Sequence, residues 1–395
     1  MRRVLIGFAV VVALGALTLV GVWLSARKNL GSAPDAQRVE LLKESPQWRG
    51  GRFTNRLPRV DRGLGTAAVE FFLGSDAPRM PQEPLETQEL HRKDFAERAP
   101  LRMTWLGHSS MILDVDGARF LIDPVWGERA SPLSFAGPLR FYPSPLPMAE
   151  LPDVDAVVIS HDHYDHLDFP TVRQLAHVDV QWLVPLGVGS HLEYWGIDSK
   201  RITELDGWDE YTVRGVQAVC TPSRHFSGRS IGGQNSTLWA GWAFVGSSHR
   251  AFFSGDTALH PEFAEIGQRF GPFDLTMFEV GAYNQAWADV HLGPEQAVLA
   301  HQLVRGKLMV PVHWGLFDLA LHGWTEPVER LKRAAETLNV SLAIPRPGGS
   351  VTPESGAFSS DFWPSDLPWK TAAQAPAWSS AVVDLQKPLR ADPSD

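Results

Sequence analysis

A cluster of metal-competent side chains directly after an apolar strand constrains this chain more than any other feature. The run Ala156–Ser160 predicts a buried strand, and the segment His161-Asp162-His163-Tyr164-Asp165-His166 follows it at once. Histidines two residues apart on extended backbone converge on one metal ion, while Asp165 and His166 lie beyond them, placed for a second ion. Imidazole and carboxylate together suit zinc and other borderline divalent metals. The segment predicts a metal centre; the alternative is a solvated polar loop.

Three single residues elsewhere repeat this placement after strand-like runs: His225, Asp256 and His313. Functional loops of α/β folds gather at strand ends. Taken alone, each would be a structural histidine or a capping aspartate. Together with the first segment they complete a set of seven metal ligands. The set assigns His161, His163 and His225 to one ion, Asp165, His166 and His313 to the other, and Asp256 as the bridge.

Short runs rich in β-branched and aromatic residues recur from Leu101 onward, separated by turn residues. Ten runs predict strands: Leu101–Trp105, Met111–Val115, Arg119–Ile122, Ala156–Ser160, Trp182–Pro185, Val216–Thr221, Thr237–Val245, Ala251–Ser254, Leu275–Val280 and Leu308–Val312. Four segments predict helices: Pro170–Ala176, Pro261–Phe270, Pro294–Val304 and Glu326–Leu338. Early strands follow one another as a meander and later ones alternate with helices. We therefore predict an α/β fold, a four-layer αββα sandwich.

The N-terminal residues differ from the rest of the chain. Val4 to Leu24 is an uncharged, mostly apolar run with basic residues on both sides, long enough to cross a bilayer. We expect a transmembrane helix that anchors the protein to a bacterial inner membrane with the catalytic domain on the periplasmic side; a cleaved signal segment is the alternative. The net charge of −9 argues against a nucleic-acid partner. The single cysteine, Cys220, excludes an intramolecular disulfide, and the oligomeric state stays open.

Composition divides the chain into four parts. Residues 1–29 form the expected anchor or signal segment. Residues 30–98 are rich in Pro, Gly, Arg and Gln and predict an irregular arm that wraps the core. Residues 99–350 hold the predicted metallo-hydrolase domain, and residues 351–395 predict a loose C-terminal tail.

The ligand pattern resembles the metallo-β-lactamase superfamily over roughly residues 100 to 350. The resemblance rests on Ser160-His161-x-His163-x-Asp165-His166, the lone His225, Gly255-Asp256-Thr257 and His313. The bridging position holds Asp256 rather than the cysteine of many true metallo-β-lactamases. The resemblance implies a hydrolase with two Zn²⁺ ions, other divalent metals being the alternative.

Segments outside the ligand set are similar to N-acyl-phosphatidylethanolamine-hydrolysing phospholipase D and its bacterial relatives. They are Thr104-Trp105-Leu106-Gly107-His108, Asp123-Pro124, Arg129-Ala130-Ser131-Pro132, Gly137-Pro138, Arg140-Phe141, Gly271-Pro272-Phe273-Asp274, His291-x-x-Pro294-Glu295-x-Ala297, His313-Trp314-Gly315 and, in the arm, Gly51-Arg52-Phe53-x-Asn55. This resemblance implies a membrane phospholipid substrate, whose phosphodiester a metal-bridging hydroxide would cleave to N-acylethanolamine and phosphatidic acid. It also implies that Tyr164 and His291 contact the lipid; a helix-capping partner is the alternative for His291.

Three other residues have predicted roles close to the metals. Asp165 orients the nucleophile or accepts its proton while it ligates a metal. Asp123 follows a strand and is expected to hydrogen-bond a ligand histidine from outside the ligand shell, or else to cap a turn. His108 and His322 are candidates for the pocket rim. The ligands leave two alternatives open: a dizinc hydrolase of another ester, such as a lactone or a soluble phosphodiester, and a non-catalytic metal-binding membrane protein.

Overall fold

Two seven-stranded sheets face each other in this computed structural model, which describes residues 2–60, 77–230, 232–355, 362–364 and 366–381. The first sheet has the order β16-β3-β4-β5-β6-β7-β8 and the second has the order β15-β14-β13-β12-β11-β10-β9. The strands of the first sheet are β3 (Leu101–Gly107), β4 (Ser110–Val115), β5 (Ala118–Ile122), β6 (Ala156–Val158), β7 (Gln181–Pro185), β8 (Ile202–Leu205) and β16 (Ser350–Val351). Those of the second are β9 (Glu210–Val213), β10 (Val216–Pro222), β11 (Ala240–Val245), β12 (Arg250–Phe253), β13 (Phe273–Glu279), β14 (Gly306–Val312) and β15 (Ser341–Leu342).

Alternation along the strands of the first sheet explains why the sheets stack. Met111, Leu113 and Val115 of β4 belong to the core that contacts the second sheet. Ile112, between them, belongs to a separate apolar cluster on the opposite face. Successive side chains of a strand point to opposite faces, so this sheet buries both faces.

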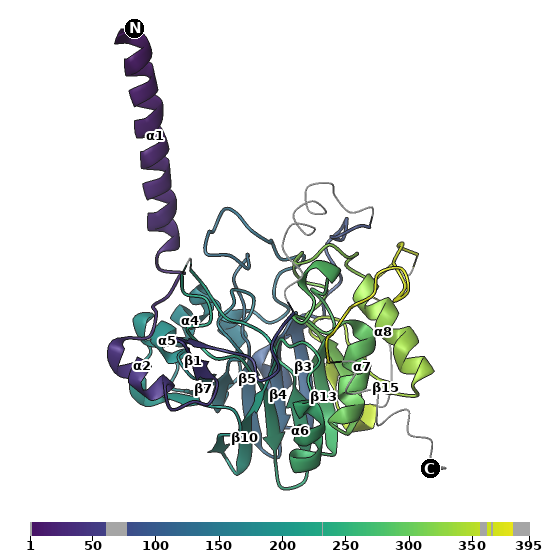
Figure 1. Ribbon diagram of the computed structural model, residues 1–395. Coiled ribbons are helices and arrows are strands. Elements are labelled where there is room, and N and C mark those ends of the chain that lie inside the picture. Colours follow the sequence, from purple (N-terminus) through teal and green to yellow (C-terminus); the bar gives the residue numbers. More distant parts are fainter. Residues whose placement is uncertain (1, 61–76, 231, 356–361, 365, 382–395) are drawn as a thin grey trace.

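Helices cover the two outer faces, and Figure 1 shows α4 and α5 on one side with α7 and α8 on the other. The covering helices are α4 (Phe169–Leu175), α5 (Gly189–Tyr194), α6 (Glu262–Phe270), α7 (Pro294–Leu303) and α8 (Glu326–Thr337). Val172 of α4 and Leu192 of α5 pack in the outer cluster of the first sheet. Phe263, Val298 and Leu331 of the other three helices pack in the main core. The predicted αββα layering of an α/β fold is confirmed.

All ten predicted strands and all four predicted helices are confirmed, with small shifts at their ends. Within the sandwich, sequence reasoning missed β8, β9, α5 and the two-residue strands β15 and β16. Three of the four residues of β9 are exposed, so this edge strand lacks the apolar run that identified the others. Helix α5 has only six residues, too few to show an apolar period. Short 3-10 turns complete the domain at Arg92–Phe95, Met148–Glu150, Ser199–Arg201, Gln285–Trp287 and Pro353–Ser355.

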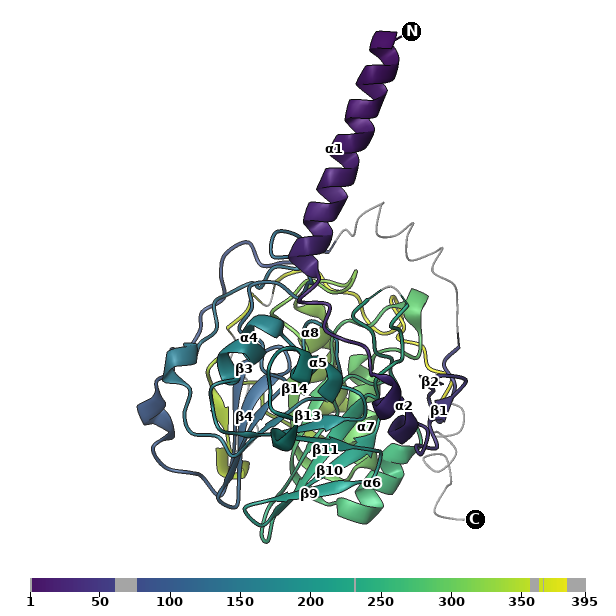
Figure 2. The same cartoon turned by 90° about the vertical axis from the view of Figure 1, so that its left-hand side faces the viewer.

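Helix α1 (Arg2–Ala26) projects away from the sandwich in both views (Figures 1 and 2). Among the described residues, no helix combines the length and the apolar character that crossing a membrane requires. The expected transmembrane helix over residues 4–24 is thus not supported, and its side chains up to Val11 lie outside the described residues.

The arm contains regular elements that the sequence did not predict, and the described part of the tail is packed against the domain. In the arm, α2 (Ala36–Leu42) precedes the short hairpin of β1 (Trp48–Arg49) and β2 (Arg52–Phe53), and residues 61–76 lie outside the described part. In the tail, Trp363 is buried and donates a hydrogen bond through Nε1 to Glu329 at 2.6 Å. Ser379 donates through Oγ to Asp289 at 3.0 Å. The described residues 362–364 and 366–381 are therefore not a loose tail, while residues 356–361, 365 and 382–395 lie outside the described part.

Candidate metal centre

The seven predicted ligands come together at one edge of the sandwich, where the carboxyl ends of several strands meet. Strands β5 to β8 run parallel to one another, and so do β12 to β15. Strand β10 has the same direction as β12, because both are antiparallel to β11. The residues that follow β6, β10, β12 and β14 emerge at one edge, where their ligand atoms lie close together. The sequence identifies each of these strand ends separately. The order of the strands in the two sheets is what brings them together into one site.

The first group of potential ligands consists of His161, His163, His225 and Asp256. One nitrogen or oxygen atom from each lies within 4.8 Å of the corresponding atoms of the others. His163 Nδ1 lies 2.9 Å from His161 Nε2 and 3.3 Å from His225 Nε2. Asp256 Oδ2 is 3.7 Å from His161 Nε2 and 3.8 Å from His225 Nε2. These four residues could hold one ion.

The second group consists of Asp165, His166 and His313, and it meets the first at Asp256. Asp165 Oδ2 lies 3.4 Å from His166 Nε2 and 3.3 Å from His313 Nε2. The two oxygens of Asp256 lie 3.2 Å from His166 Nε2 and 3.0 Å from His313 Nε2. Asp256 therefore lies between both groups, where a bridging carboxylate would be needed.

Unsatisfied atoms show that this cluster fits metal ions. His166 Nε2, His313 Nε2 and Asp256 Oδ1 are buried. Although they lie 3.0–3.2 Å from other atoms of the cluster, none makes a hydrogen bond of suitable geometry among the described residues. A buried polar atom without a partner is costly, so each such atom in a folded protein needs an explanation. Divalent cations would satisfy all three, and the imidazole and carboxylate set matches the ligands of zinc and similar metals.

Hydrogen bonds from outside the cluster orient two of the histidine rings. Asp123 accepts hydrogen bonds from the backbone N–H of Ser160 at 2.7 Å and from Nδ1 of His166 at 2.7 Å. The Nδ1 atom of His225 donates to the carbonyl oxygen of Val290 at 2.9 Å. Both bonds leave Nε2 of the ring to face the cluster. The expected contact of Asp123 with a ligand histidine is present.

His291, for which the family resemblance implied a lipid contact, lies at the edge of the cluster. Its Nδ1 bonds to Glu279 Oε2 at 2.7 Å and lies 3.8 Å from Asp256 Oδ2. Glu279 also accepts hydrogen bonds from the backbone of Thr257 and Leu292. Sequence reasoning missed Glu279, although a carboxylate at the end of an otherwise apolar strand is a recognisable signal.

Tyr164 lies in a different environment. Its hydroxyl donates to the carbonyl oxygen of Arg229 at 2.5 Å, and the guanidinium of Arg229 lies 4.1 Å from the centre of its ring. Arg229 in turn donates to the carbonyl oxygens of Asp162 and Leu167 at 2.6 and 2.7 Å. This buried arginine therefore binds the backbone at both ends of the loop that carries the predicted ligands. The Tyr164 hydroxyl bonds to Arg229 and not to the ligand groups.

Opposite charges shift the protonation of the cluster. Burial alone would lower the pKa of His313, but the carboxylates of Asp256 and Asp165 raise it to about 10. Burial likewise opposes a rise at His166, yet Asp256, Asp165 and Asp123 raise the pKa of this ring well above its usual value. Burial lowers the pKa of His161 and His225 well below theirs, so these rings are neutral.

His108 also lies in the second group, although the predicted ligand set did not contain it. Its Nε2 lies 2.9 Å from Asp165 Oδ2, and its ring centre is 4.1 Å from that of His313. Burial and the charge of His313 lower the pKa of His108 to about 3. His108 and His313 both have left-handed backbone, with φ of 53° and 62°, a conformation that costs roughly 1–3 kcal/mol per residue and concentrates at functional sites. His108 therefore holds Asp165 as a neutral ring.

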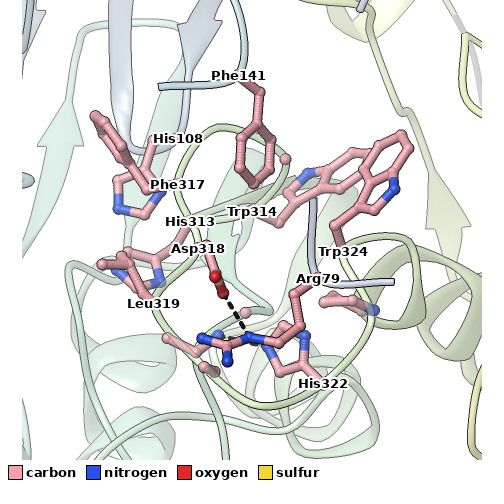
Figure 3. Close-up of a pocket in the computed structure, with 15 residues that line it drawn as sticks. Arg79, His108, Phe141, His313, Trp314, Phe317, Asp318, Leu319, His322 and Trp324 are labelled. Atoms are coloured by element: carbon pink, nitrogen blue, oxygen red, sulfur yellow. Dashed lines mark hydrogen bonds and ion pairs between the residues drawn. The ribbon is translucent and has the colours of Figure 1, made fainter. Parts of the chain in front are cut away.

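A pocket opens beside the second group (Figure 3). His108 and His313 form one part of its wall, and the predicted rim residue His322 forms another. The pocket is otherwise lined largely by apolar side chains, among them Phe141, Trp314, Phe317, Leu319 and Trp324. Arg79 and Asp318 meet in it, with Arg79 Nε 3.0 Å from Asp318 Oδ1. The pocket thus offers an apolar surface and a guanidinium next to the metal-competent residues.

Comparisons with known proteins agree with this geometry. Residues 118–314 match the beta-lactamase superfamily domain. The chain is 47% identical to an uncharacterised protein of Mycobacterium tuberculosis over 330 residues, which cover 81% of this chain and 88% of that protein. It is 38% identical to N-acyl-phosphatidylethanolamine-hydrolyzing phospholipase D 1 of Caenorhabditis elegans over 262 residues, which cover 63% and 73% of the two chains.

The fold is also that of solved metallo-hydrolases. The structure of a metallo hydrolase from the archaeon Ignicoccus hospitalis superimposes with a TM-score of 0.50 at 20% identity, covering 64% of this chain and 97% of that one. The paired sheets, the His and Asp clusters and these relatives all agree. The chain belongs to the metallo-β-lactamase superfamily and is a metal-dependent hydrolase.

Proposed function

We propose that this protein is a dizinc phosphodiesterase of the phospholipase D type that cleaves N-acyl-phosphatidylethanolamine. The observation that carries the proposal is the pair of ligand groups joined at Asp256 beside a largely apolar pocket that also contains Arg79. The lining of this pocket offers a guanidinium for an anionic phosphodiester and apolar side chains for a neighbouring apolar group. The similarity to the Caenorhabditis elegans phospholipase D supports the same substrate class.

The two ligand groups indicate which residues would bind each ion. His161, His163, His225 and Asp256 would bind one ion, and Asp165, His166, His313 and Asp256 would bind the other. When bound, two adjacent cations lower the pKa of a water and neutralise charge that develops on a phosphoryl group. The residues around them provide orientation.

Asp165 would orient the attacking water, and the contact of His108 Nε2 with Asp165 Oδ2 at 2.9 Å would hold its carboxylate in place. The water oxygen forms a bond to phosphorus, and the bond from phosphorus to the ethanolamine oxygen breaks. The products are N-acylethanolamine, which takes up a proton, and phosphatidic acid. His291 is positioned to contact the phosphodiester, because Glu279 engages Nδ1 of its ring and leaves Nε2 for the substrate.

The test is hydrolysis by purified full-length protein loaded with zinc. N-acyl-phosphatidylethanolamine in mixed micelles should yield N-acylethanolamine and phosphatidic acid by mass spectrometry, with two zinc ions bound per chain. Parallel reactions with a panel of lactones and with bis-p-nitrophenyl phosphate measure the two alternative substrate classes. Faster turnover of a lactone or of the soluble phosphodiester would reject the lipid assignment.

Two variants test the ligand assignment in the same assay. Asp256→Ala and His313→Ala should lose bound zinc and activity together, by more than the ~10–100-fold that is typical of residues outside the ligand shell. Lys307→Ala is the matched control, because Lys307 pairs with Asp274 at the opposite end of β14 from His313. An Asp256→Ala protein that keeps two zinc ions and full turnover would refute the proposal.

A further inference from the structure

We propose that Asn55 of the N-terminal arm is a positioning residue for the metal ligand His225. The inference rests on the proposed function, because it takes His225 to be a ligand of the first ion. It assigns a role to part of the segment that the sequence predicted to be an irregular arm outside the hydrolase domain.

The side-chain amide of Asn55 holds the backbone of His225 from both sides. Asn55 Nδ2 donates to the carbonyl oxygen of His225 at 2.8 Å, and the backbone N–H of His225 donates to Asn55 Oδ1 at 3.1 Å. A third bond fixes which way the amide points, because Trp239 Nε1 donates to Oδ1 at 3.0 Å and an indole N–H can only donate. Asn55 thus acts on His225 as a neighbouring strand would.

The ring of His225 is fixed separately, through the bond from Nδ1 to Val290. With the backbone held by Asn55 and the ring held by Val290, little freedom remains for the position of Nε2, which faces His163 and Asp256. Residues outside the ligand shell that orient a ligand in this way typically change metal affinity or activity by ~10–100-fold when they are replaced.

The neighbouring part of the arm accepts hydrogen bonds from Arg224, the residue before His225. The buried guanidinium of Arg224 donates through Nε to the carbonyl oxygen of Leu57 at 3.0 Å and also bonds the carbonyl oxygen of Pro58. Arg224 pairs with Asp289 at 2.7 Å. On the other side of Asn55, Phe53 is fully buried against Trp239 and Leu238. The arm is therefore anchored on both sides of Asn55, which keeps the amide in register with His225.

The experiment compares three variants of the full-length protein. Asn55→Ala removes both bonds to His225. Thr54→Ala is the matched control, because the described partner of Thr54 Oγ1 is the carbonyl oxygen of Gln47 within the arm, at 3.1 Å. His225→Ala removes the ligand itself. For each, binding of Zn²⁺ and Co²⁺ is measured by competition with a chelator, the visible spectrum of the Co²⁺ form is recorded, and thermal unfolding is measured without metal.

Asn55→Ala is expected to weaken binding of one of the two ions by ~10–100-fold and to change the Co²⁺ spectrum, while the other ion binds as in the wild type. Thr54→Ala should match the wild type in both. The proposal is overturned when Asn55→Ala keeps wild-type affinity and spectrum, or when both arm variants weaken binding equally, since either result makes the arm a structural support. A His225→Ala protein that still binds two ions would instead reject the ligand assignment.

Discussion

Asp123 Oδ2 lies 2.7 Å from Nδ1 of His166, and both side chains are fully buried beneath the metal-competent residues. Asp123 also accepts bonds from the backbone N–H of Ser160 through Oδ1 and from its hydroxyl through Oδ2. A carboxylate only accepts, so Nδ1 of His166 carries the proton in this contact and Nε2 is available to a metal. Asp123 therefore determines which nitrogen of His166 faces Asp256.

Asp123→Asn should weaken binding of the second ion by ~10–100-fold and should also lower the stability of the metal-free fold, because Asp123 is the buried partner of His166. With Oδ1 kept on the Ser160 N–H, the new amide N–H₂ would point at Nδ1 of His166 and favour the tautomer with a proton on Nε2. Metal titration with thermal unfolding of the metal-free protein measures both effects. Asp116→Asn, which alters a contact with His249 on the surface, is the control. Unchanged affinity in Asp123→Asn would contradict the tautomer argument.

Metal binding should become tighter as the pH rises. The nearby carboxylates raise the pKa of His313 to about 10 and that of His166 well above its usual value, against the effect of burial. Near neutral pH both rings therefore hold protons that a metal must displace, and each proton displaced changes the apparent affinity by about tenfold per pH unit below the pKa. Calorimetry in two buffers of different ionisation heat measures the protons released. Binding without proton release would show that these rings are not ligands.

Trp242→Phe should destabilise the fold by ~1–3 kcal/mol. Trp242 is fully buried between the two sheets, and its Nε1 donates to the carbonyl oxygen of Ile159 at 3.0 Å, two residues before His161. Phenylalanine keeps most of the packing but leaves that carbonyl without its partner. Chemical denaturation measures the change. Trp23→Phe, whose tryptophan is 57% exposed, should stay within ~0.5 kcal/mol of the wild type, and an equal effect of both variants would exclude this explanation.

Arg79→Ala should raise KM for an anionic phosphodiester by roughly tenfold or more, because a hydrogen bond to a charged group is worth ~1.5–3 kcal/mol. The guanidinium lines the pocket beside His313 and is held there by Asp318. The value of kcat should change less, since Arg79 is absent from the two ligand groups. Steady-state kinetics with the phospholipid and with an uncharged lactone separates the cases. An equal loss on both substrates would point to a collapsed pocket.

The sequence predicted the sandwich and the ligands for a local reason. A buried strand requires a run of apolar residues, and the polar residues after the run mark the strand end. The run Ala156–Ser160 therefore predicted the strand, and His161 marked where it ends. The same logic placed Asp256 and His313. This logic missed β9, because β9 is exposed at a sheet edge and has no apolar run in its sequence. The transmembrane helix expected over residues 4–24 is not supported among the residues that the structure describes.

Two determinants of this protein can thus be separated. The sequence by itself determined the kind of chemistry, because ligand type and spacing are covalent properties of short segments such as His161 to His166. Only the tertiary structure decided how that chemistry is held in place. Asn55 contacts His225 from 170 residues away, and no local pattern records such a pairing. The order of the strands brings those segments to one edge, and the resulting burial and charge fix the protonation of the metal ligands.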